Sequence, residues 1–357
     1  MSTHKHPFNT TKVPYEVLKK TCMEAIEVDT RIKPFNALIN LFSSDSYHIE
    51  RFHSKNFELR LIEILEENDF DIIHLESIFC TPYLNRIRLK SKAKVVLRAH
   101  NIEFEIWKQL ANQEINPLKK WYLDLLAERL KTYEIKLLSQ VDAIVPITNK
   151  DKAEMTKLGV SVPMEVVPLG VDVDKIESKN LQPEPLKLYH LGAMDWSPNV
   201  EGITWFLDDI WPLISSEFPS ISCSLAGRKM SPSLLSRSNG KLMIRGEVSD
   251  ISEFISDKNI AVIPLLSGSG MRVKIVEALA FGKVVITTTL GATGISFDDG
   301  INILIANKPS EFVEKIGMLK ANPSLITSIG LEARKLAKTE FNLKSLSSKL
   351  SYFYSNL

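Results

Sequence analysis

A loop with two glycines precedes a cluster of charged side chains in the second half of the chain. Residues 264–283 read PLLSGSGMRVKIVEALAFGK, and the residues there that could bind a ligand are Gly268, Gly270, Arg272, Lys274 and Glu277. Backbone N–H groups at the start of a helix after a glycine turn favour an anion. Two cations beside that turn would add donors for a phosphate. A solvated turn between a strand and a helix is the alternative, because such turns are common in α/β domains.

Neither of two common phosphate-binding motifs fits this loop. A Walker A loop requires G-x-x-x-x-G-K-[ST], but Lys274 neither follows a glycine nor precedes a serine or threonine. A dinucleotide-binding fingerprint requires G-x-G-x-x-G, but Val273 occupies the position of the third glycine. A phosphate-binding role for this loop therefore needs support from the elements around it.

The chain has the length and composition of a globular protein with two domains. Its 357 residues, of which 44% are hydrophobic and 24% charged, suit two domains of about 150 residues each. A net charge of +1 gives no indication of nucleic-acid binding. The three cysteines lie far apart and form no C-x-x-C pair, so we expect neither a disulfide framework nor a zinc site. They are Cys22, Cys80 and Cys223.

Neither a secretory signal nor a membrane-spanning segment is visible in the sequence. The first residues, MSTHKHPFNTTKVPY, lack the apolar run of a signal peptide. No apolar run reaches the length of about 18 residues that a membrane helix needs. We therefore expect a cytoplasmic protein, and docking onto the inner face of a membrane stays open.

Apolar strands alternate with amphipathic helices, which is typical of parallel α/β sheets. In the first half, strands are predicted over 70–75, 93–100 and 141–148, and helices over about 57–68 and 117–140. In the second half, the predicted strands are 186–192, 220–227, 241–246, 259–266, 283–288 and 302–306. Helices are predicted near 200–216, 271–281, 311–320 and 325–340. The apolar stripe on the long helix at 117–140 predicts a core-facing side.

A polar segment with prolines separates the two halves. We predict an N-terminal Rossmann-like domain over 1–165, a linker over 166–185, a second Rossmann-like domain over 186–340, and a helix over 341–357 that packs back on the first domain. Parallel sheets bind ligands beyond the carboxyl ends of their strands, so the expected site is a cleft between the domains. The segments that follow strands and carry candidate side chains are RAHN (98–101), HLGAMDW (190–196), AGRKM (226–230) and the loop in 264–283.

The second half resembles the donor-binding domain of GT-B glycosyltransferases of family four. The resemblance rests on AVIPLLSGSGMRVKIVEALAFGKVVITTTLGATGI, preceded by PLGVD and KLMIRGEVSDISEFI, and it extends over nearly the whole chain. Its most specific part is the Glu277–Ala278 pair, then Gly282, then the strand VVITT and the turn at 291–294. It implies an α/β protein of GT-B architecture, with two Rossmann-like domains whose parallel sheets face each other across a cleft.

The resemblance assigns donor-binding roles to the opening loop. Glu277 matches the second glutamate of the family's E-x7-E motif, which accepts hydrogen bonds from the ribose hydroxyls. A carboxylate suits this role because it can accept two O–H bonds at once. The chain departs from the motif at Ser269, where the family often has another glutamate. Contact with the donor sugar would then fall to the loop backbone, at Gly268, Ser269, Gly270 and Met271.

A second departure concerns the diphosphate. Many members have a basic pair soon after the first strand of the donor domain, but this chain has GAMDWSPNVEG there, without lysine or arginine. Arg272 and Lys274 would supply the positive charge from the opposite loop, and Gly192, in the turn after the first strand, is where the backbone would approach the phosphate. The leaving nucleoside diphosphate gains negative charge during the reaction, so these cations would stabilise the transition state more than the ground state.

Further roles follow from positions after other strands. His100 matches the histidine of the first domain that faces the donor sugar, and imidazole can both donate to and accept from a hydroxyl. Arg228 is expected at the rim of the site or at the phosphates. Gly246 and Val248 resemble the turn whose backbone reads the base.

No metal site is expected. The D-x-D triplets at 69–71 and 172–174 have the form of a metal motif from another glycosyltransferase fold. Here the first precedes a strand and the second lies in the linker. Glu76 follows a strand and could act as a general base or, equally, as a cap.

The resemblance implies a retaining glycosyltransferase without a cofactor. It would move a sugar from a nucleotide diphosphate sugar to a hydroxyl of a carbohydrate or lipid-linked carbohydrate, in cell-surface polysaccharide or glycoconjugate synthesis. A catalytically impaired nucleotide-sugar-binding or scaffold protein is the alternative, in view of Ser269 and of the family's opening segment, which the start of this sequence does not match. A sugar-phosphate epimerase of the same architecture is a third possibility, but it would need acid and base carboxylates, for which the sequence offers Glu76.

The first domain of this family opens with a strand, a glycine-rich turn and a helix that MSTHKHPFNTTK does not match. Without that strand, the apolar edges of the strands at 70–75 and 93–100 should be exposed. We expect an upstream extension of some tens of residues to restore expression of folded protein. A monomeric, cooperatively unfolding and active 357-residue chain would contradict this expectation, and sedimentation, thermal unfolding and a transfer assay are the measurements.

Overall fold

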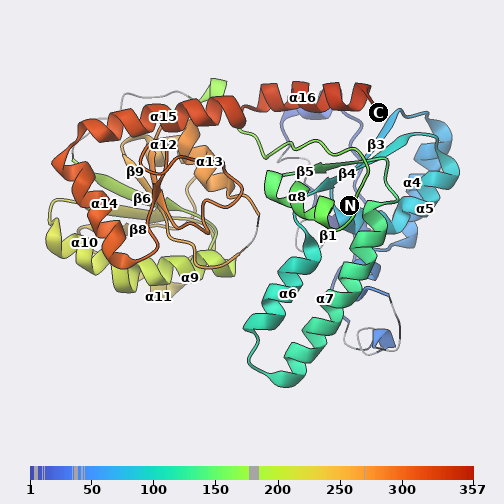
Figure 1. The fold of residues 1–357 in the computed structure, drawn as a ribbon, viewed down its shortest axis with the longest axis horizontal. Helices are drawn as coiled ribbons and strands as arrows, with labels where there is room; N and C mark the ends of the chain where they lie inside the picture. The colour runs from blue at the N-terminus through green and yellow to red at the C-terminus, as the bar shows by residue number, and fades with distance from the viewer. Residues whose placement is uncertain are drawn as a thin grey trace. The chain divides into compact units, whose positions relative to one another are not determined.

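The computed structural model divides the chain into two compact units. It describes residues 1–3, 7–9, 11, 13–33, 35, 39–41, 43, 45–176, 185–268 and 270–357. The first unit is Met1–Val166 with Phe353–Leu357, and the second is Val167–Tyr352 (Figure 1). Of the predicted linker, residues 177–184 lie outside the described part.

A parallel sheet forms the centre of the first unit. Its order is β3 (Ile72–Leu75), β4 (Lys94–Ala99) and β5 (Ala143–Pro146). A separate parallel pair consists of β1 (Ser2–Thr3) and β2 (Glu27–Val28). The helical segments of this unit are α1 (Tyr15–Lys20), α3 (Tyr47–Glu50), α4 (Lys55–Glu67), η2 (Ile78–Tyr83), α5 (Leu84–Lys90), α6 (Glu103–Gln113), α7 (Pro117–Leu138) and α8 (Asn149–Lys157).

The expected exposure of β4 is wrong. This strand lies between β3 and β5, with Val96 opposite both His74 and Ala143. Residues Val95 to Leu97 are at most 1% exposed, because neighbouring strands and helices cover them from both sides. In the described sheet the outer strands are β3 and β5. The first three residues of β3 are half-buried, and Ile144 of β5 forms an isolated bridge with Met164.

Two antiparallel helices, α6 and α7, form a hairpin that extends beyond this sheet (Figure 1). The prediction of a core-facing stripe on α7 is confirmed at Leu126, Leu130 and Leu137, which are at most 4% exposed. The base of the hairpin is fixed by Glu134 of α7, whose carboxylate accepts from two N–H groups in the first turn of α6, at 3.1 and 3.0 Å. This contact is an N-terminal cap supplied by a neighbouring helix.

The second unit contains a six-stranded parallel sheet. Its order is β8 (Leu242–Ile244), β7 (Ser222–Ala226), β6 (Lys187–Leu191), β9 (Ile260–Ile263), β10 (Val284–Thr287) and β11 (Leu304–Ile305). In sequence order this is the 3-2-1-4-5-6 arrangement of a Rossmann fold. The strands read as short apolar runs because helices cover the sheet, and β9 and β10 are buried throughout.

The connections of the second unit place helices on the sheet. They are η3 (Val173–Lys175), α9 (Ser197–Trp205), η4 (Phe206–Ile210), α10 (Trp211–Glu217), α11 (Pro232–Leu235), α12 (Ile251–Ser256), α13 (Val273–Ala280), α14 (Pro309–Ala321) and α15 (Ser324–Glu340). Its core includes Phe206, Ile210 and Phe312, all fully buried. The predicted helix at 200–216 is in fact the continuous run α9–η4–α10, in which η4 is a π-helical turn.

The chain ends in α16 (Leu343–Ser355), which begins beside the start of the second unit, since Leu343 N donates to Val171 O at 3.0 Å. The final residues are grouped with the first unit, where the Tyr354 hydroxyl is hydrogen-bonded to His74 Nδ1. Among the described residues, no helix combines the length and apolarity needed to cross a bilayer.

Three turns after neighbouring strands are joined closely at the carboxyl edge of the second sheet. Gly192 N donates to Ala226 O at 3.0 Å, and Gly227 N donates to Gly246 O at 3.1 Å. A Cβ on Gly227 would lie 1.8 Å from the carbonyl oxygen of Gly192, which is too close for any side chain. The close approach of these turns therefore requires glycine at 227.

We expect Gly227→Ala to destabilise the protein by about 3 kcal/mol, because the backbone at Gly192 must shift to admit the methyl group. Gly240→Ala is the matched control, since a Cβ there has no heavy atom within 4 Å. Urea unfolding followed by circular dichroism measures both. Equal stability of the two variants would contradict the packing described here.

Candidate functional site

The residues singled out in 264–283 lie where the strand order of the second unit's sheet reverses, between β6 and β9. Strands β6 and β9 are neighbours, with Leu188 opposite Ile260. The chain leaves β6 towards α9 and β7, and it leaves β9 towards α13 and β10. The turn after β6 and the loop after β9 thus lie together at the carboxyl edge, at the switch point where such sheets bind ligands.

Lys274, in the first turn of α13, points to the turn after β6. Its ammonium donates to Asn199 Oδ1 at 2.5 Å and lies 3.5 Å from His190 Nε2. The other ring nitrogen of His190 lies 2.8 Å from Val262 O, so it carries the proton and donates. Burial, then the Lys274 charge, holds the pKa of His190 well below its usual value, and the ring is neutral.

Burial also acts on Lys274 itself. Removal from solvent, then the nearby Arg272 charge, lowers its pKa to about 7, although Glu277 opposes the shift. A cation in this position gains free energy when an anion approaches, because the anion restores the protonated form. The side chains of Lys274 and Arg272, largely removed from solvent, therefore favour a negatively charged ligand.

Arg272 immediately precedes α13 and is 5% exposed. Its Nη1 donates to Gly270 O at 2.9 Å, and its guanidinium carbon lies 5.3 Å from the Trp196 ring centroid. Burial lowers its pKa to about 10. Stacking on an aromatic face is favourable for guanidinium and fixes its plane.

Glycines make room for these cations. Gly268 has φ +103°, and a Cβ there would lie 3.0 Å from Arg272 Nη2 and 3.2 Å from Trp196. A Cβ on Gly192 would lie 2.8 Å from the Lys274 ammonium. The N–H of Gly192 already donates to Ala226 O, so this glycine serves to admit Lys274 rather than to donate to a phosphate.

Glu277 lies one turn after Lys274 on α13 and is half-buried. Burial raises its pKa, and Lys274 opposes the shift. The carboxylate lines a small cavity of about 20 Å³ together with Tyr189 of β6 and Ile255 of α12. The Tyr189 side chain is 4% exposed, and burial followed by the Glu277 charge raises the pKa of its hydroxyl.

The other predicted donor residues lie at varying distances from this centre. Arg228 follows β7 and is exposed, with its Nη2 3.3 Å from Asp195 Oδ2 in the turn after β6. Met271 is buried beside Arg272. Ser269 lies outside the described residues.

Gly246 and Val248 follow β8, two strands away from β6. Val248 lines a groove of about 550 Å³ whose wall also includes Met243 and Arg245. Glu277 lines the separate small cavity, and α12 contributes to both. The base-reading role of this turn stays a prediction.

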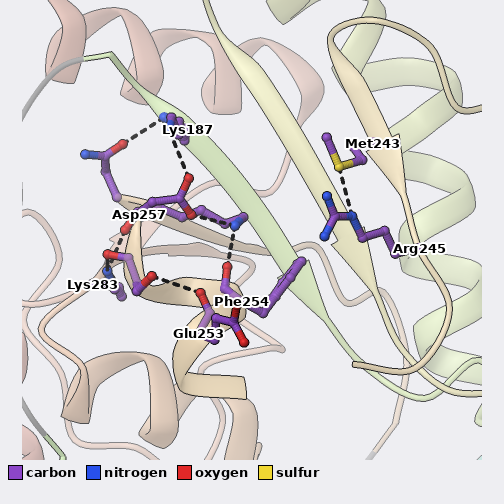
Figure 2. A network of polar contacts seen from close by, with 10 residues as sticks. Lys187, Met243, Arg245, Glu253, Phe254, Asp257 and Lys283 are labelled. Atoms are coloured by element: carbon purple, nitrogen blue, oxygen red, sulfur yellow. Dashed lines mark hydrogen bonds and ion pairs between the residues drawn. The ribbon is translucent and has the colours of Figure 1, made fainter. Parts of the chain in front are cut away.

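Figure 2 shows a polar network at the starts of β6, β9 and β10, at the end of the sheet opposite the cations. Asp257 accepts from Lys187 at 2.9 Å and from Lys258 at 2.7 Å, and Lys283 donates to Lys258 O at 2.6 Å. At the edge of the groove, Arg245 Nε contacts Met243 Sδ. These contacts hold the strands in register, and none of them involves Arg272, Lys274 or Glu277.

His100 belongs to the first unit and follows β4. Its Nε2 lies 3.7 Å from Glu76 Oε1, and Glu76 also accepts from His74 Nε2 at 2.7 Å. Contacts with His100 and then His74 hold the pKa of Glu76 far below its usual value. A general base needs a pKa nearer neutrality, so Glu76 does not suit that role. Its hydrogen bond is with His74, and His100 Nε2 has no hydrogen-bond partner among the described residues.

Sequence reasoning missed the side chains that position the cations. Trp196 and Asn199 both come from GAMDWSPNVEG, the segment noted only for its lack of basic residues, and His190 comes from the end of β6. A tryptophan four residues and an asparagine seven residues after the strand-end Gly192 were the available signal. No group of His, Cys, Asp and Glu that could hold a metal ion is found in the described part of the chain.

Two family models together match most of the chain. Residues 41–175 match the model described as Glycosyltransferase Family 4, and residues 185–322 match Glycosyl transferases group 1. A curated relative, an uncharacterized 44.6 kDa protein in the cps region of Klebsiella pneumoniae, is 24% identical over 303 residues, which cover 82% of this chain and 76% of the relative.

Solved glycosyltransferase structures share the fold at low sequence identity. Sucrose-phosphate synthase from Thermosynechococcus elongatus is 14% identical with a TM-score of 0.66, over 87% of this chain and 78% of that one. A glycosyltransferase from Rickettsia africae is 17% identical with a TM-score of 0.65, over 96% and 91%. Anabaena HepE in complex with UDP is 12% identical with a TM-score of 0.65, over 85% and 82%. The chain therefore belongs to the GT-B glycosyltransferases of family four.

Proposed function

We propose that this glycosyltransferase moves a sugar from a nucleotide diphosphate sugar to a hydroxyl of a carbohydrate or lipid-linked carbohydrate, with retention of configuration. The observation that carries the donor class is the Arg272–Lys274 pair at the switch point of the second sheet. Two adjacent cations with pKa values lowered by burial suit a diphosphate, which brings several negative charges to one place. HepE, a structural neighbour, is described in complex with UDP and with UDP-glucose.

The proposed roles follow the order of the residues along the chain. The loop at 268–271 faces the sugar, Arg272 and Lys274 face the diphosphate, and Glu277 accepts from the ribose hydroxyls. As the bond between sugar and phosphate breaks, negative charge grows on the leaving diphosphate, and the two cations stabilise it. His100 of the first unit contacts a hydroxyl of the sugar.

Retention is proposed from the family resemblance, with the acceptor attacking on the face that the phosphate leaves and the phosphate taking the acceptor proton. A role in cell-surface polysaccharide or glycoconjugate synthesis is supported by the relative in the cps region. No cofactor and no metal are proposed, since the cations would supply the charge that a metal could bring.

Diphosphate binding should be linked to proton uptake. The free protein holds Lys274 with a pKa of about 7, and a bound diphosphate raises that pKa towards the ordinary lysine value of about 10.4. Between these values, binding takes up about one proton and affinity falls as pH rises. Calorimetry with UDP at pH 8 in buffers of different ionisation enthalpy measures the uptake. Lys274→Met should abolish it, and an unchanged uptake in that variant would contradict the assignment.

Substitutions of the two cations and of Glu277 should change different kinetic parameters. Arg272→Ala and Lys274→Ala should each lower kcat by about 30-fold to 1,000-fold, equivalent to about 2–4 kcal/mol of transition-state stabilisation. Glu277→Gln should mainly raise KM for the donor, because ribose contacts exist in both ground and transition states. Lys335→Ala, an exposed lysine on α15, is the control.

A comparison of turnover with binding separates a transferase from a protein that only binds nucleotide sugars. Wild-type turnover in both cation variants would refute the phosphate role. Calorimetric binding of nucleotide sugars without turnover, in transfer and hydrolysis assays over a panel of donors, would favour the scaffold alternative.

A further inference from the structure

The end of the α6–α7 hairpin exposes large apolar side chains. Ile115 in the connecting turn is 94% exposed, and Leu118 and Trp121 in the first turns of α7 are 80% and 59% exposed. Leu110, in the last turns of α6, is 44% exposed. We call these four residues the hairpin tip. Single exposed apolar residues are ordinary, but a group of four including a tryptophan on one protruding end indicates a binding surface.

The hairpin presents its tip on a fixed support. At the base, Glu134 caps α6, and farther along α7 Arg129 donates to the carbonyl oxygens of Asn40 and Leu41 at 2.7 and 3.0 Å. Leu126 and Leu130 are buried in the middle of α7. The tip extends away from the sheet β3–β4–β5, as Figure 1 shows. These side chains are therefore held out from the body of the first unit rather than folded onto it.

The charges around the tip are paired with one another. Lys119 Nζ lies 2.5 Å from Glu114 Oε2. Lys108 Nζ lies 3.2 Å from Asp124 Oδ1 and 3.3 Å from Glu128 Oε1. Lys120 lies 3.8 Å from Asp124 Oδ2. Lysines and carboxylates thus balance closely here. Any partner of the tip must be attracted mainly by its apolar side chains.

A bilayer surface fits this patch better than a protein does. A stable protein interface takes about 800 Å² from each partner, supplied by about 20–30 residues. The tip is a narrow end of two helices with four apolar side chains. Shallow insertion among lipid headgroups needs no matching surface, and tryptophan and lysine are suited to that boundary because each has an apolar body and a polar end.

We propose that the hairpin tip inserts into the interfacial region of a lipid bilayer and holds this glycosyltransferase on a membrane surface. Insertion is driven by burial of Ile115, Leu118 and Trp121, with Leu110 at the edge. Because the lysines are paired, insertion does not depend on anionic lipid. The proposal is independent of the donor-site assignments, since it concerns other residues and is measured without turnover.

Flotation of the full chain with vesicles of pure phosphatidylcholine tests the proposal. The wild type should float, equally at low and high salt, and Ile115→Ser/Leu118→Ser should lower the partition coefficient by about tenfold or more. Leu89→Ser is the matched control, because Leu89 on α5 of the same unit is 73% exposed and lies outside the tip. It should float like the wild type.

A second, conservative variant guards against misfolding. Brominated phosphatidylcholine should quench part of the wild-type tryptophan fluorescence, and Trp121→Phe should lose that part while keeping the thermal unfolding midpoint. Three results would overturn the proposal: a wild type that stays unbound, binding that requires anionic lipid and disappears in salt, or equal losses in the Leu89 control. Concentration-dependent self-association in solution that the tip variant abolishes would instead assign the tip to contact between copies and would also overturn it.

Discussion

Two cationic side chains held close together and largely out of solvent are the constraint around which the second unit is arranged. Arg272 is buried and Lys274 half-buried, and burial lowers the pKa of both. Such groups are costly to a fold unless the surrounding atoms fix and partly solvate them. Asn199 and neutral His190 solvate Lys274, and the Trp196 ring covers Arg272.

Glycines in the backbone around the cations also help to fix the position of Lys274. Glycine at 192 leaves room for the ammonium, and glycine at 227 lets the next turn approach within contact of Gly192. The order of the strands brings these turns together, because β6 lies between β7 and β9. A change in any one of these glycines would move the atoms that position Lys274, although none of them carries a charge.

The polar network at the opposite end of the sheet has a different role. Asp257 and three lysines join the starts of β6, β9 and β10, and their contacts are with each other and with backbone carbonyls (Figure 2). Charge density alone therefore does not distinguish a ligand site from a structural one. The distinguishing features are the switch point, the lowered pKa of Lys274 and the glycines that keep space beside it.

The sequence by itself determined the parallel α/β class, the positions of the strands in the two larger sheets to within a few residues, and the segment that carries Arg272, Lys274 and Glu277. It did not indicate the short pair β1–β2. Apolar runs and helical periodicity are local properties, so they can be recognised along the chain. The partners of the cations could not be, because Asn199 and His190 lie 75 and 84 residues from Lys274 and meet it only when β6 and β9 pair. The tertiary structure also decided that β4 is central in its sheet and that Glu76 is hydrogen-bonded to His74. Only strand pairing and helix packing fix which distant side chains share a low-dielectric environment, and that environment sets their charge.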